Sequence, residues 1–215
     1  PIIIGQDSRE SCSMVVSALS AGLTSAGKDV WTIGLSPTPA VAHLVKECHA
    51  SGGLMVSASH NPPEDNGIKF FDCNGEKLSS DKERIIDNGL QEKIIFSHCK
   101  KNYVNRQELI KDYQDSLIKT IGHEILKDIP IVLDLCWGSA TACTAEIFKS
   151  IGAKVKSINS EPDGEKINVN CGSTHLQAIK KAVIETESEM GFAFDGDADR
   201  MIAIDRKGRV IDGDH

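Results

Sequence analysis

The sequence predicts an α/β fold built from two three-layer α/β/α domains, each with a mixed, mostly parallel four-stranded sheet. Short apolar runs alternate with amphipathic stretches along all 215 residues, a pattern typical of sheets covered by helices. The order strand, helix, strand, helix, strand, strand occurs in both halves. Sequence identity between the halves is too low for a sequence repeat, so we expect two structurally similar units.

In the first half, the apolar run at residues 2–5 predicts the first strand, and a helix follows at residues 9–26. Apolar residues recur at helical spacing in this helix, and Gly27 ends it. The turn Ser36-Pro37-Thr38-Pro39 then starts a second helix that runs to about Cys48. The other predicted elements are strands at residues 30–34, 53–57 and 67–71 and a polar helix near residues 81–91.

Residues 96–105 have weak periodicity and mixed charge, so we place the domain boundary at their end. The first domain then covers residues 1–105 and the second covers residues 106–215. The second domain repeats the alternation of the first and closes with two strands on either side of an acidic loop. Its predicted strands cover residues 131–135, 154–158, 191–194 and 201–205, and its helices cover residues 106–121, 139–151 and 174–187.

Charge and composition narrow the function classes. The 24 basic and 31 acidic residues give a formal net charge of −7, and no basic patch stands out, so no nucleic-acid partner is expected. The seven cysteines are scattered without a CxxC motif, which favours reduced thiols and a cytoplasmic protein. No apolar run approaches the length that crosses a membrane. The first residues do not form a signal peptide, and because the chain opens on Pro1 directly before a strand, we expect a piece of a longer polypeptide.

The segment Ser57-Ala58-Ser59-His60-Asn61-Pro62 follows a predicted strand and presents a hydroxyl framed by small residues and prolines. A serine that accepts a phosphoryl group needs an exposed hydroxyl with positive charge or dipoles nearby. Ser59 fits this need, because His60 can donate to a phosphate oxygen or exchange a proton and Lys69 can return to the same site. A Ser-rich turn capped by a histidine is the plainer alternative, and Ser57 is a rival hydroxyl. A Ser-His-Asp hydrolase is disfavoured, since this segment has no Gly-x-Ser-x-Gly elbow.

A second loop, Asp195-Gly196-Asp197-Ala198-Asp199-Arg200, offers three carboxylates at alternate positions beside an arginine. Carboxylate oxygens suit Mg²⁺ better than Zn²⁺, and three close negative charges repel one another unless a cation neutralises them. We therefore predict a metal site rather than a solvated acidic turn. A serine that can carry phosphate and carboxylates that can hold a divalent cation are complementary parts of one phosphoryl-transfer site.

The residues also bear on three other kinds of site. An EF-hand requires glycine and glutamate at loop positions where this chain has Arg200 and Arg206, so it is rejected. An aspartyl-phosphate phosphatase of the haloacid dehalogenase class, with Asp195 as the nucleophile, is a weaker competitor. The turn Gly138-Ser139-Ala140 lacks a dinucleotide-binding fingerprint and is interpreted as an ordinary strand-to-helix connection.

Together, the motifs resemble those of the α-D-phosphohexomutase family over essentially the whole chain. Ser57–Pro63 with Asn66-Gly67-Ile68-Lys69 resembles the family's phosphoserine loop, residues 195–200 resemble its metal loop, and Gly5-Gln6-Asp7-Ser8-Arg9 resembles its N-terminal arginine motif. The resemblance implies that Ser59 carries a covalent phosphate. It implies one Mg²⁺ held by Asp195, Asp197, Asp199 and a phosphoryl oxygen on Ser59.

The resemblance also implies an enzyme, an intramolecular phosphotransferase that works through a phosphoserine and a sugar bisphosphate. Arg200 is expected to offset charge on the transferring group, while Arg9, His60 and Lys69 are expected to orient it and move protons. Residues 167–175 and 37–42 are most similar to the branch that interconverts glucosamine 6-phosphate and glucosamine 1-phosphate. The alternative is the phosphomannomutase/phosphoglucomutase branch.

Family members have four domains, and this chain resembles the first two. The missing partners are then a third domain that recognises the sugar and a fourth that clamps its phosphate. We expect the 215-residue chain to be inactive alone and the full-length protein to form a possible homodimer. A non-catalytic phosphosugar-binding module is the alternative outside the enzymes.

Overall fold

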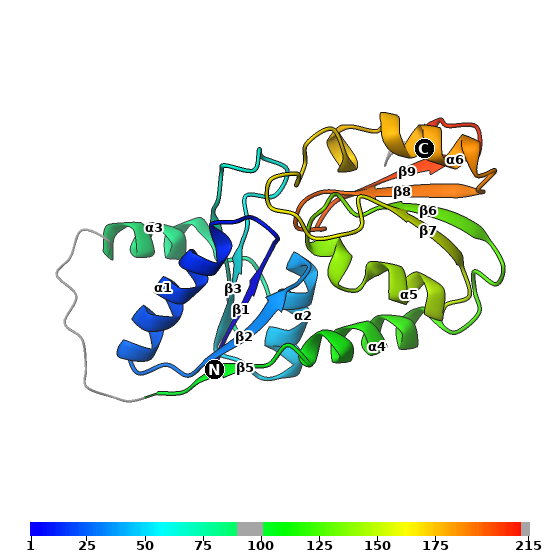
Figure 1. Cartoon of the computed structure of the whole chain (residues 1–215). Coiled ribbons are helices and arrows are strands. Elements are labelled where there is room, and N and C mark those ends of the chain that lie inside the picture. Colours follow the sequence, from blue (N-terminus) through cyan, green and yellow to red (C-terminus); the bar gives the residue numbers. More distant parts are fainter. Residues whose placement is uncertain (90–100, 212–215) are drawn as a thin grey trace.

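The computed structural model describes residues 1–89 and 101–211. Its architecture is two five-stranded sheets, each with helices on both faces (Figure 1). The predicted three-layer α/β/α class is therefore confirmed, with one more strand per sheet than expected. The end of the predicted helix near 81–91 and residues 96–100 of the predicted boundary segment lie outside the described residues.

The first sheet has the strand order β4-β3-β1-β2-β5. β1 pairs in parallel with both β2 and β3, β2 pairs in parallel with β5, and β4 runs antiparallel to β3 at the opposite edge. The strands are β1 (Ile2–Gln6), β2 (Val30–Leu35), β3 (Gly52–Val56), β4 (Ile68–Phe71) and β5 (Tyr103–Asn105).

The second sheet repeats this plan with the order β10-β9-β8-β6-β7. β6 pairs in parallel with β7 and β8, while β9 runs antiparallel to β8 and to β10. The strands are β6 (Pro130–Asp134), β7 (Lys154–Ile158), β8 (Met190–Phe194), β9 (Met201–Asp205) and β10 (Val210–Ile211).

The two strands that the sequence did not predict, β5 and β10, lie at sheet edges. They are three and two residues long, and all three side chains of β5 are exposed. A strand that buries no apolar face leaves no alternating pattern in the sequence. The expectation of four strands was wrong for the first sheet for this reason. In the second sheet, Val210 of β10 packs against the core, but two residues are too few to show an alternating pattern.

Six α-helices in the described chain cover the sheets. On the first sheet, α1 packs on one face through Cys12 and Val16, and α2 packs on the other through Val41 and Leu44. On the second sheet, α5 and α6 take opposite faces. The helices are α1 (Cys12–Ser25), α2 (Thr38–Glu47), α3 (Ser80–Gly89), α4 (Leu109–Ile121), α5 (Thr144–Ser150) and α6 (Gln177–Glu185).

The predicted helix at residues 139–151 is divided in the structure. A 3₁₀ turn, Ser139–Ala142, precedes α5, and Cys143 between them leaves helical geometry with φ −152°. The N–H of Ser139 donates to the carbonyl of Gly196 at 2.9 Å, so contact with the carboxylate loop fixes this first turn. A second 3₁₀ turn, Gly172–Thr174, lies where the helix expected at residues 174–187 should begin. The helix α6 itself begins at Gln177.

Helix α4 joins the two halves. Its residues Leu109 and Tyr113 are buried in one apolar cluster with Val41 of α2 and Ile147 of α5. The halves therefore share packed core and are not linked by a loose connection. In the part of the chain that the structure describes, no helix has the length and apolar character to pass through a membrane.

Candidate functional site

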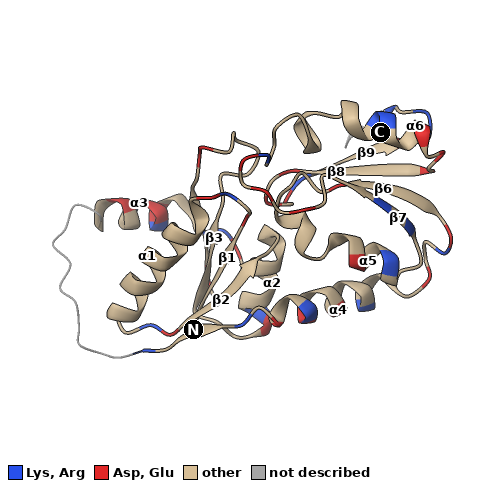
Figure 2. Cartoon of the chain, in the orientation of Figure 1, with Lys and Arg blue, Asp and Glu red and all other residues tan. Residues whose placement is uncertain are grey.

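The serine loop and the carboxylate loop lie against each other between the two sheets. Ser59 follows β3 and Asp195 follows β8, each at the carboxyl end of a strand with a parallel neighbour. Ser59 Oγ donates a hydrogen bond to Asp195 Oδ2 at 2.8 Å. Figure 2 shows acidic and basic segments together in the loops between the sheets. The structure thus brings the serine from one half into contact with a carboxylate from the other.

The backbone at Ser59 is held in the left-handed region, with φ 56°. Its N–H donates to Ser57 Oγ at 2.9 Å, and Ser57 Oγ in turn donates to Asp7 Oδ2 at 2.6 Å. Ser57 is buried, so its hydroxyl supports the loop from inside. Of the two candidate hydroxyls, that of Ser59 contacts the carboxylate loop, while that of Ser57 contacts Asp7.

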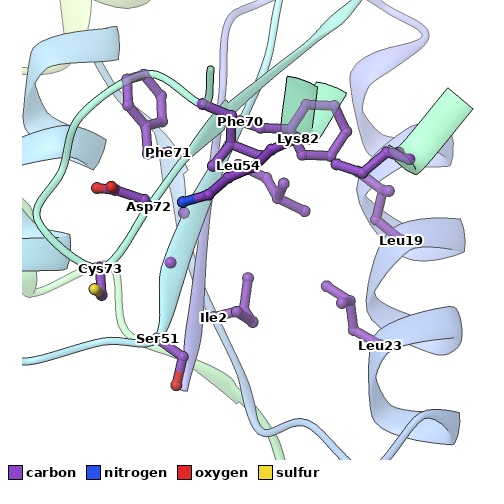
Figure 3. Close-up of a pocket in the computed structure, with 14 residues that line it drawn as sticks. Ile2, Leu19, Leu23, Ser51, Leu54, Phe70, Phe71, Asp72, Cys73 and Lys82 are labelled. Atoms are coloured by element: carbon purple, nitrogen blue, oxygen red, sulfur yellow. The ribbon is translucent and has the colours of Figure 1, made fainter. Parts of the chain in front are cut away.

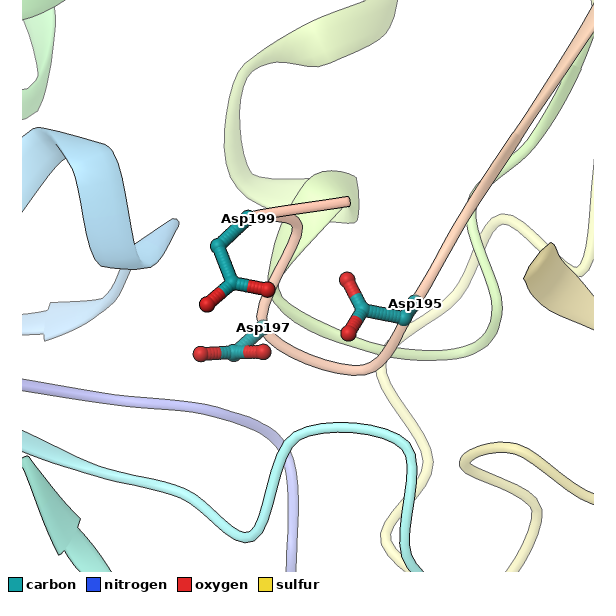
Figure 4. Close-up of side chains that lie close together, drawn as sticks. All are labelled: Asp195, Asp197 and Asp199. Atoms are coloured by element: carbon teal, nitrogen blue, oxygen red, sulfur yellow. The ribbon is translucent and has the colours of Figure 1, made fainter. Parts of the chain in front are cut away.

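The three aspartates form one cluster, shown in Figure 4. One oxygen from each of Asp195, Asp197 and Asp199 lies within 4.8 Å of the others. Asp195 and Asp197 are fully buried, and Asp197 Oδ1 is buried without a hydrogen-bond partner in the described structure. An unpartnered buried carboxylate oxygen is costly. This orphaned atom, in a set of hard oxygen donors, fits a site for Mg²⁺.

Burial shifts the pKa of Asp195 in this cluster. It raises the pKa of Asp195, and the negative charge of Asp197 raises it further. Lys69, on β4, lies close enough to offset some of this charge, because its Nζ is 2.5 Å from Asp197 Oδ2 and 2.7 Å from Asp199 Oδ2. Burial alone disfavours the ammonium, but its hydrogen bonds to both carboxylates outweigh that effect and raise the pKa of Lys69. Lys69 is therefore held in its protonated form.

Arg200 bridges the serine and the carboxylates. Its Nη2 donates to Ser59 Oγ at 2.6 Å and to Asp195 Oδ2 at 2.9 Å, and its Nε donates to the same carboxylate oxygen at 3.1 Å. Nη2 also contacts Nδ1 of His60, the residue after Ser59. Arg200 and His60 are thus both next to the hydroxyl where a phosphoryl group would be attached.

Arg9 lies behind the serine loop and is almost completely buried. Its Nε donates to Asp7 Oδ2 at 3.0 Å. The other guanidinium donors go to four backbone carbonyls of the serine loop, at residues Ser59, Asn61, Pro62 and Asp65. All five N–H groups of a guanidinium are used by these contacts. The arrangement supports a role in shaping the loop, and direct contact of Arg9 with a transferring group stays a prediction.

Two residues that the sequence analysis assigned no role also join the halves here. Thr38, at the start of α2, donates its backbone N–H to the carbonyl of Asp197 at 2.9 Å and its hydroxyl to Asp197 Oδ2. Asn168, from the loop after β7, donates to the carbonyls of Ser59 and Asn61 at 2.8 and 3.0 Å. Both lie in segments singled out only for family resemblance. Their contacts reach more than 100 positions along the chain, so no local pattern indicates them.

An apolar pocket of about 550 Å³ lies elsewhere, beside the sheet in the first half. Figure 3 shows Leu19 and Leu23 of α1 facing Ile2 and Leu54 of the sheet. Its lining is almost entirely apolar, with Lys82 and Asp72 as its charged residues. Catalytic sites need polar groups that converge on one point. The loops around Ser59 offer that convergence and this pocket does not.

Comparison with known protein families accounts for most of the chain. Residues 1–94 match the family model described as phosphoglucomutase/phosphomannomutase, alpha/beta/alpha domain I, and residues 111–208 match domain II of the same family. The chain belongs to this family. The family indicated by the serine and carboxylate loops is thereby confirmed.

Curated relatives and a solved structure agree with this membership. The chain is 63% identical over 217 residues to the phosphoglucosamine mutase of Prochlorococcus marinus and 55% identical over 218 residues to that of Parasynechococcus marenigrum. Each alignment covers all of this chain and 47% of the relative. A phosphoglucomutase/phosphomannomutase family protein from Burkholderia thailandensis superposes with a TM-score of 0.84 at 26% identity, covering 98% of this chain and 47% of that one.

The chain spans about half the length of the curated relatives that it matches. The phosphohexomutase matches to domains I and II leave residues 95–110 between them. The domain boundary predicted after residue 105 falls in this interval and stays a prediction. The assignment of individual catalytic and metal-binding residues also stays a prediction.

Proposed function

We propose that this chain forms the phosphoryl-transfer half of a phosphosugar mutase. The proposed reaction interconverts glucosamine 6-phosphate and glucosamine 1-phosphate through a phosphoserine at Ser59 and a sugar bisphosphate. The observation that carries the proposal is the 2.8 Å hydrogen bond between Ser59 Oγ and Asp195, at the edge of the aspartate cluster. The names of the relatives at 55–63% identity favour glucosamine phosphate as the substrate.

In this proposal, Asp195, Asp197, Asp199 and one phosphoryl oxygen on Ser59 hold a single Mg²⁺. The bound ion would offset negative charge on the phosphoryl group during transfer. The buried, unpartnered Oδ1 of Asp197 supports this ligand set. Arg200 already donates to Ser59 Oγ, so a phosphate on that oxygen would lie within reach of its guanidinium.

The remaining polar groups are assigned to proton movement. When the phosphoryl group leaves Ser59 for a sugar hydroxyl, the serine oxygen must gain a proton and the sugar hydroxyl must lose one. Lys69, held protonated by Asp197 and Asp199, is the proposed donor on the serine side. His60, next to Ser59 and in contact with Arg200, is proposed to accept the proton that the sugar hydroxyl loses.

The aspartyl-phosphate hydrolase is disfavoured by the surroundings of Asp195. Oδ2 of Asp195 accepts from Ser59 and twice from Arg200, and Oδ1 accepts from the backbone N–H of Arg200 at 3.1 Å. A nucleophilic carboxylate must leave one oxygen open to attack phosphorus. These contacts instead favour Asp195 as a hydrogen-bond partner of the serine.

The test uses the full-length protein with glucosamine, glucose and mannose phosphates and a sugar bisphosphate as activator. We expect glucosamine phosphate to be converted fastest and mass spectrometry to locate the covalent phosphate on Ser59. Ser59→Ala should abolish turnover, while Ser13→Ala, at an exposed position of α1, should leave it unchanged. Phosphate on Asp195, or undiminished turnover in Ser59→Ala, would contradict the proposal, and a preference for mannose or glucose phosphate would favour the other branch.

The metal assignment has a separate readout. Titration calorimetry should detect Mg²⁺ binding to the wild type and lose it in Asp197→Asn, because one ligand charge and the orphaned acceptor are removed. Asp128→Asn is the matched control, since Asp128 is exposed and forms an ion pair with Lys154, at 2.9 Å, in the described part of the chain. Equal Mg²⁺ affinity in both variants would exclude Asp197 as a ligand.

A further inference from the structure

Asn168 connects the second half of the molecule to the serine loop of the first. It lies in the loop between β7 and the 3₁₀ turn at Gly172, is buried, and has φ 62°. Its Nδ2 donates to the carbonyls of Ser59 and Asn61. Carbonyl oxygens only accept hydrogen bonds, so the amide must turn its NH₂ group toward them.

The other end of the Asn168 amide is fixed within its own half. Oδ1 accepts from Cys136 Sγ at 3.2 Å. The buried carboxylate of Asp134, at the end of β6, accepts the backbone N–H groups of Cys136 at 3.0 Å and Gly172 at 2.9 Å. These contacts tie Cys136, which donates to the Asn168 amide, and Gly172, four residues after Asn168, to the end of β6 in the second sheet. The amide is therefore anchored independently of the serine loop.

The carboxylate loop packs at the same point. A Cβ atom on Gly196 would lie 2.6 Å from the carbonyl oxygen of Ser59 and 2.9 Å from Nδ2 of Asn168. Asn168, Gly196 and the Ser59 carbonyl thus meet without room for another carbon. A displacement of the Asn168 contact would shift the serine loop relative to Asp195 and Asp197 on either side of Gly196.

Arg9 donates to the same two carbonyls, those of Ser59 and Asn61, from the first half. The serine loop therefore has a donor from its own half that shapes it without Asn168. Asn168 adds a connection that fixes the position of the loop relative to the half that carries the aspartates. We propose that Asn168 is a positioning residue that sets the distance between Ser59 and the carboxylate cluster. This inference rests on the proposed phosphoryl transfer.

The experiment compares Asn168→Asp and Asn168→Gly in the full-length protein. Aspartate has the shape of asparagine but lacks the two N–H donors of its amide. Glycine also lacks these donors, adds no charge and tolerates a positive φ. Asn170→Asp and Asn170→Gly are matched controls, because Asn170 has φ 53°, lies two residues away and is exposed. Small misplacement of reacting groups lowers the rate of the chemical step strongly.

We expect kcat to fall at least about tenfold in both Asn168 variants, with KM for the sugar phosphate within about twofold of the wild type. The controls should retain wild-type kcat. Unchanged kcat in both Asn168 variants would overturn the proposal. A loss confined to Asn168→Asp would also overturn it, since added charge would then be the cause. A rise in KM with constant kcat would place Asn168 in substrate binding instead.

Hydrogen exchange of a peptide covering residues 57–65 supplies a readout that needs no sugar. Exchange in this peptide should be about tenfold faster in Asn168→Gly than in Asn170→Gly, because two hydrogen bonds to the loop are lost. Equal exchange in the two variants would overturn the positioning contact. If the wild type converts no sugar phosphate, the proposed function fails, and the exchange result still decides whether Asn168 holds the loop.

Discussion

Arg9 shows how one buried side chain organises the serine loop. Its guanidinium joins Asp7 to four carbonyls of the serine loop. A lysine has three donors on one nitrogen and cannot reproduce the planar fork. Arg9→Lys should therefore lower the free energy of unfolding by about 2 kcal/mol and slow phosphorylation of Ser59 by a sugar bisphosphate.

Chemical denaturation and mass spectrometry of the phosphorylated serine measure these two effects. The control is Arg84→Lys, since Arg84 is exposed on α3 and pairs at the surface with Asp81. Surface pairs of this kind contribute little to stability. Full phosphorylation rate in Arg9→Lys would show that the fork geometry is dispensable.

The buried thiol of Cys12 makes the free energy of unfolding depend on pH. Burial raises the pKa of its thiol from 9.0 to about 12, and the charge of Asp7 adds to this effect. The folded state then binds the thiol proton more tightly than the unfolded state, so the stabilising contribution is complete below pH 9 and is lost as pH rises toward 12. The free energy of unfolding should fall over this range.

Denaturation curves at stepped pH measure the slope in the wild type and in two variants. Cys12→Ala should flatten the decline, while Cys73→Ala, which removes an exposed thiol, should follow the wild type. Because the thiol of Cys12 stays protonated at pH 8, alkylation there should also require unfolding. A wild-type slope in Cys12→Ala would show that this thiol is not the titrating group.

The sequence could supply the residues whose chemistry is visible in short segments. Ser59 and the three aspartates lie in two such segments, and the structure brings both together. Thr38 and Asn168 could not be assigned roles, because their donors act on residues that only the fold brings close. The contacts of Arg9 with backbone carbonyls could not be predicted either, because every residue type has a backbone carbonyl.

At the scale of elements, the turn after β6 is shaped by its contact with the carboxylate loop. A Cβ atom on Gly138 would lie 2.4 Å from the backbone carbonyl oxygen of Gly196. Backbone cannot yield as a flexible side chain can, so Gly138→Ala should displace the loop between Asp195 and Asp197. We expect a loss of about 2 kcal/mol in stability and weaker Mg²⁺ binding.

Gly22→Ala is the opposite case on α1. An added Cβ there meets nothing within 4 Å, and alanine favours a helix interior over glycine by about 1 kcal/mol. This variant should be more stable and bind Mg²⁺ as the wild type does, measured by denaturation and calorimetry. Unaltered Mg²⁺ affinity in Gly138→Ala would show that the loop adapts without effect on the site.

The strands that the sequence predicted best have apolar side chains packed in or against a core cluster. β7 and β9 match their predicted residues 154–158 and 201–205, and β1 and β3 lie within one residue of theirs. β5 was missed because its side chains are exposed. The 3₁₀ turn Ser139–Ala142 was predicted as helix, since its geometry depends on a hydrogen bond to Gly196 far along the chain.

At the scale of the whole molecule, the site is formed where two similar halves meet. Leu109 and Tyr113 of α4 pack with Val41 of the first half and Ile147 of the second. This shared cluster fixes the orientation of the halves, and Thr38, Lys69 and Asn168 add polar contacts between them. Ser59 and Asp195 are thus placed by packing between elements that lie far apart in sequence.

The proposed reaction needs more than this junction. The side chains of Arg200 and Asp199 are 47% and 34% exposed, so one side of the candidate site is open in this chain. A sugar bisphosphate must be held on that side while it exchanges its phosphates, and the curated relatives are about twice as long as this chain. We therefore predict that the 215-residue chain binds Mg²⁺ but does not turn over glucosamine 6-phosphate.

Phosphorus NMR of glucosamine 6-phosphate with its bisphosphate measures turnover by the 215-residue chain and by the full-length protein. Full-length Ser59→Ala supplies the background rate. Mg²⁺ binding by the short chain would show that its aspartate cluster has formed, so that absence of turnover would not result from misfolding. Turnover by the short chain above this background would mean that residues 1–215 hold the sugar themselves, and the open side of the site would have to be its binding surface.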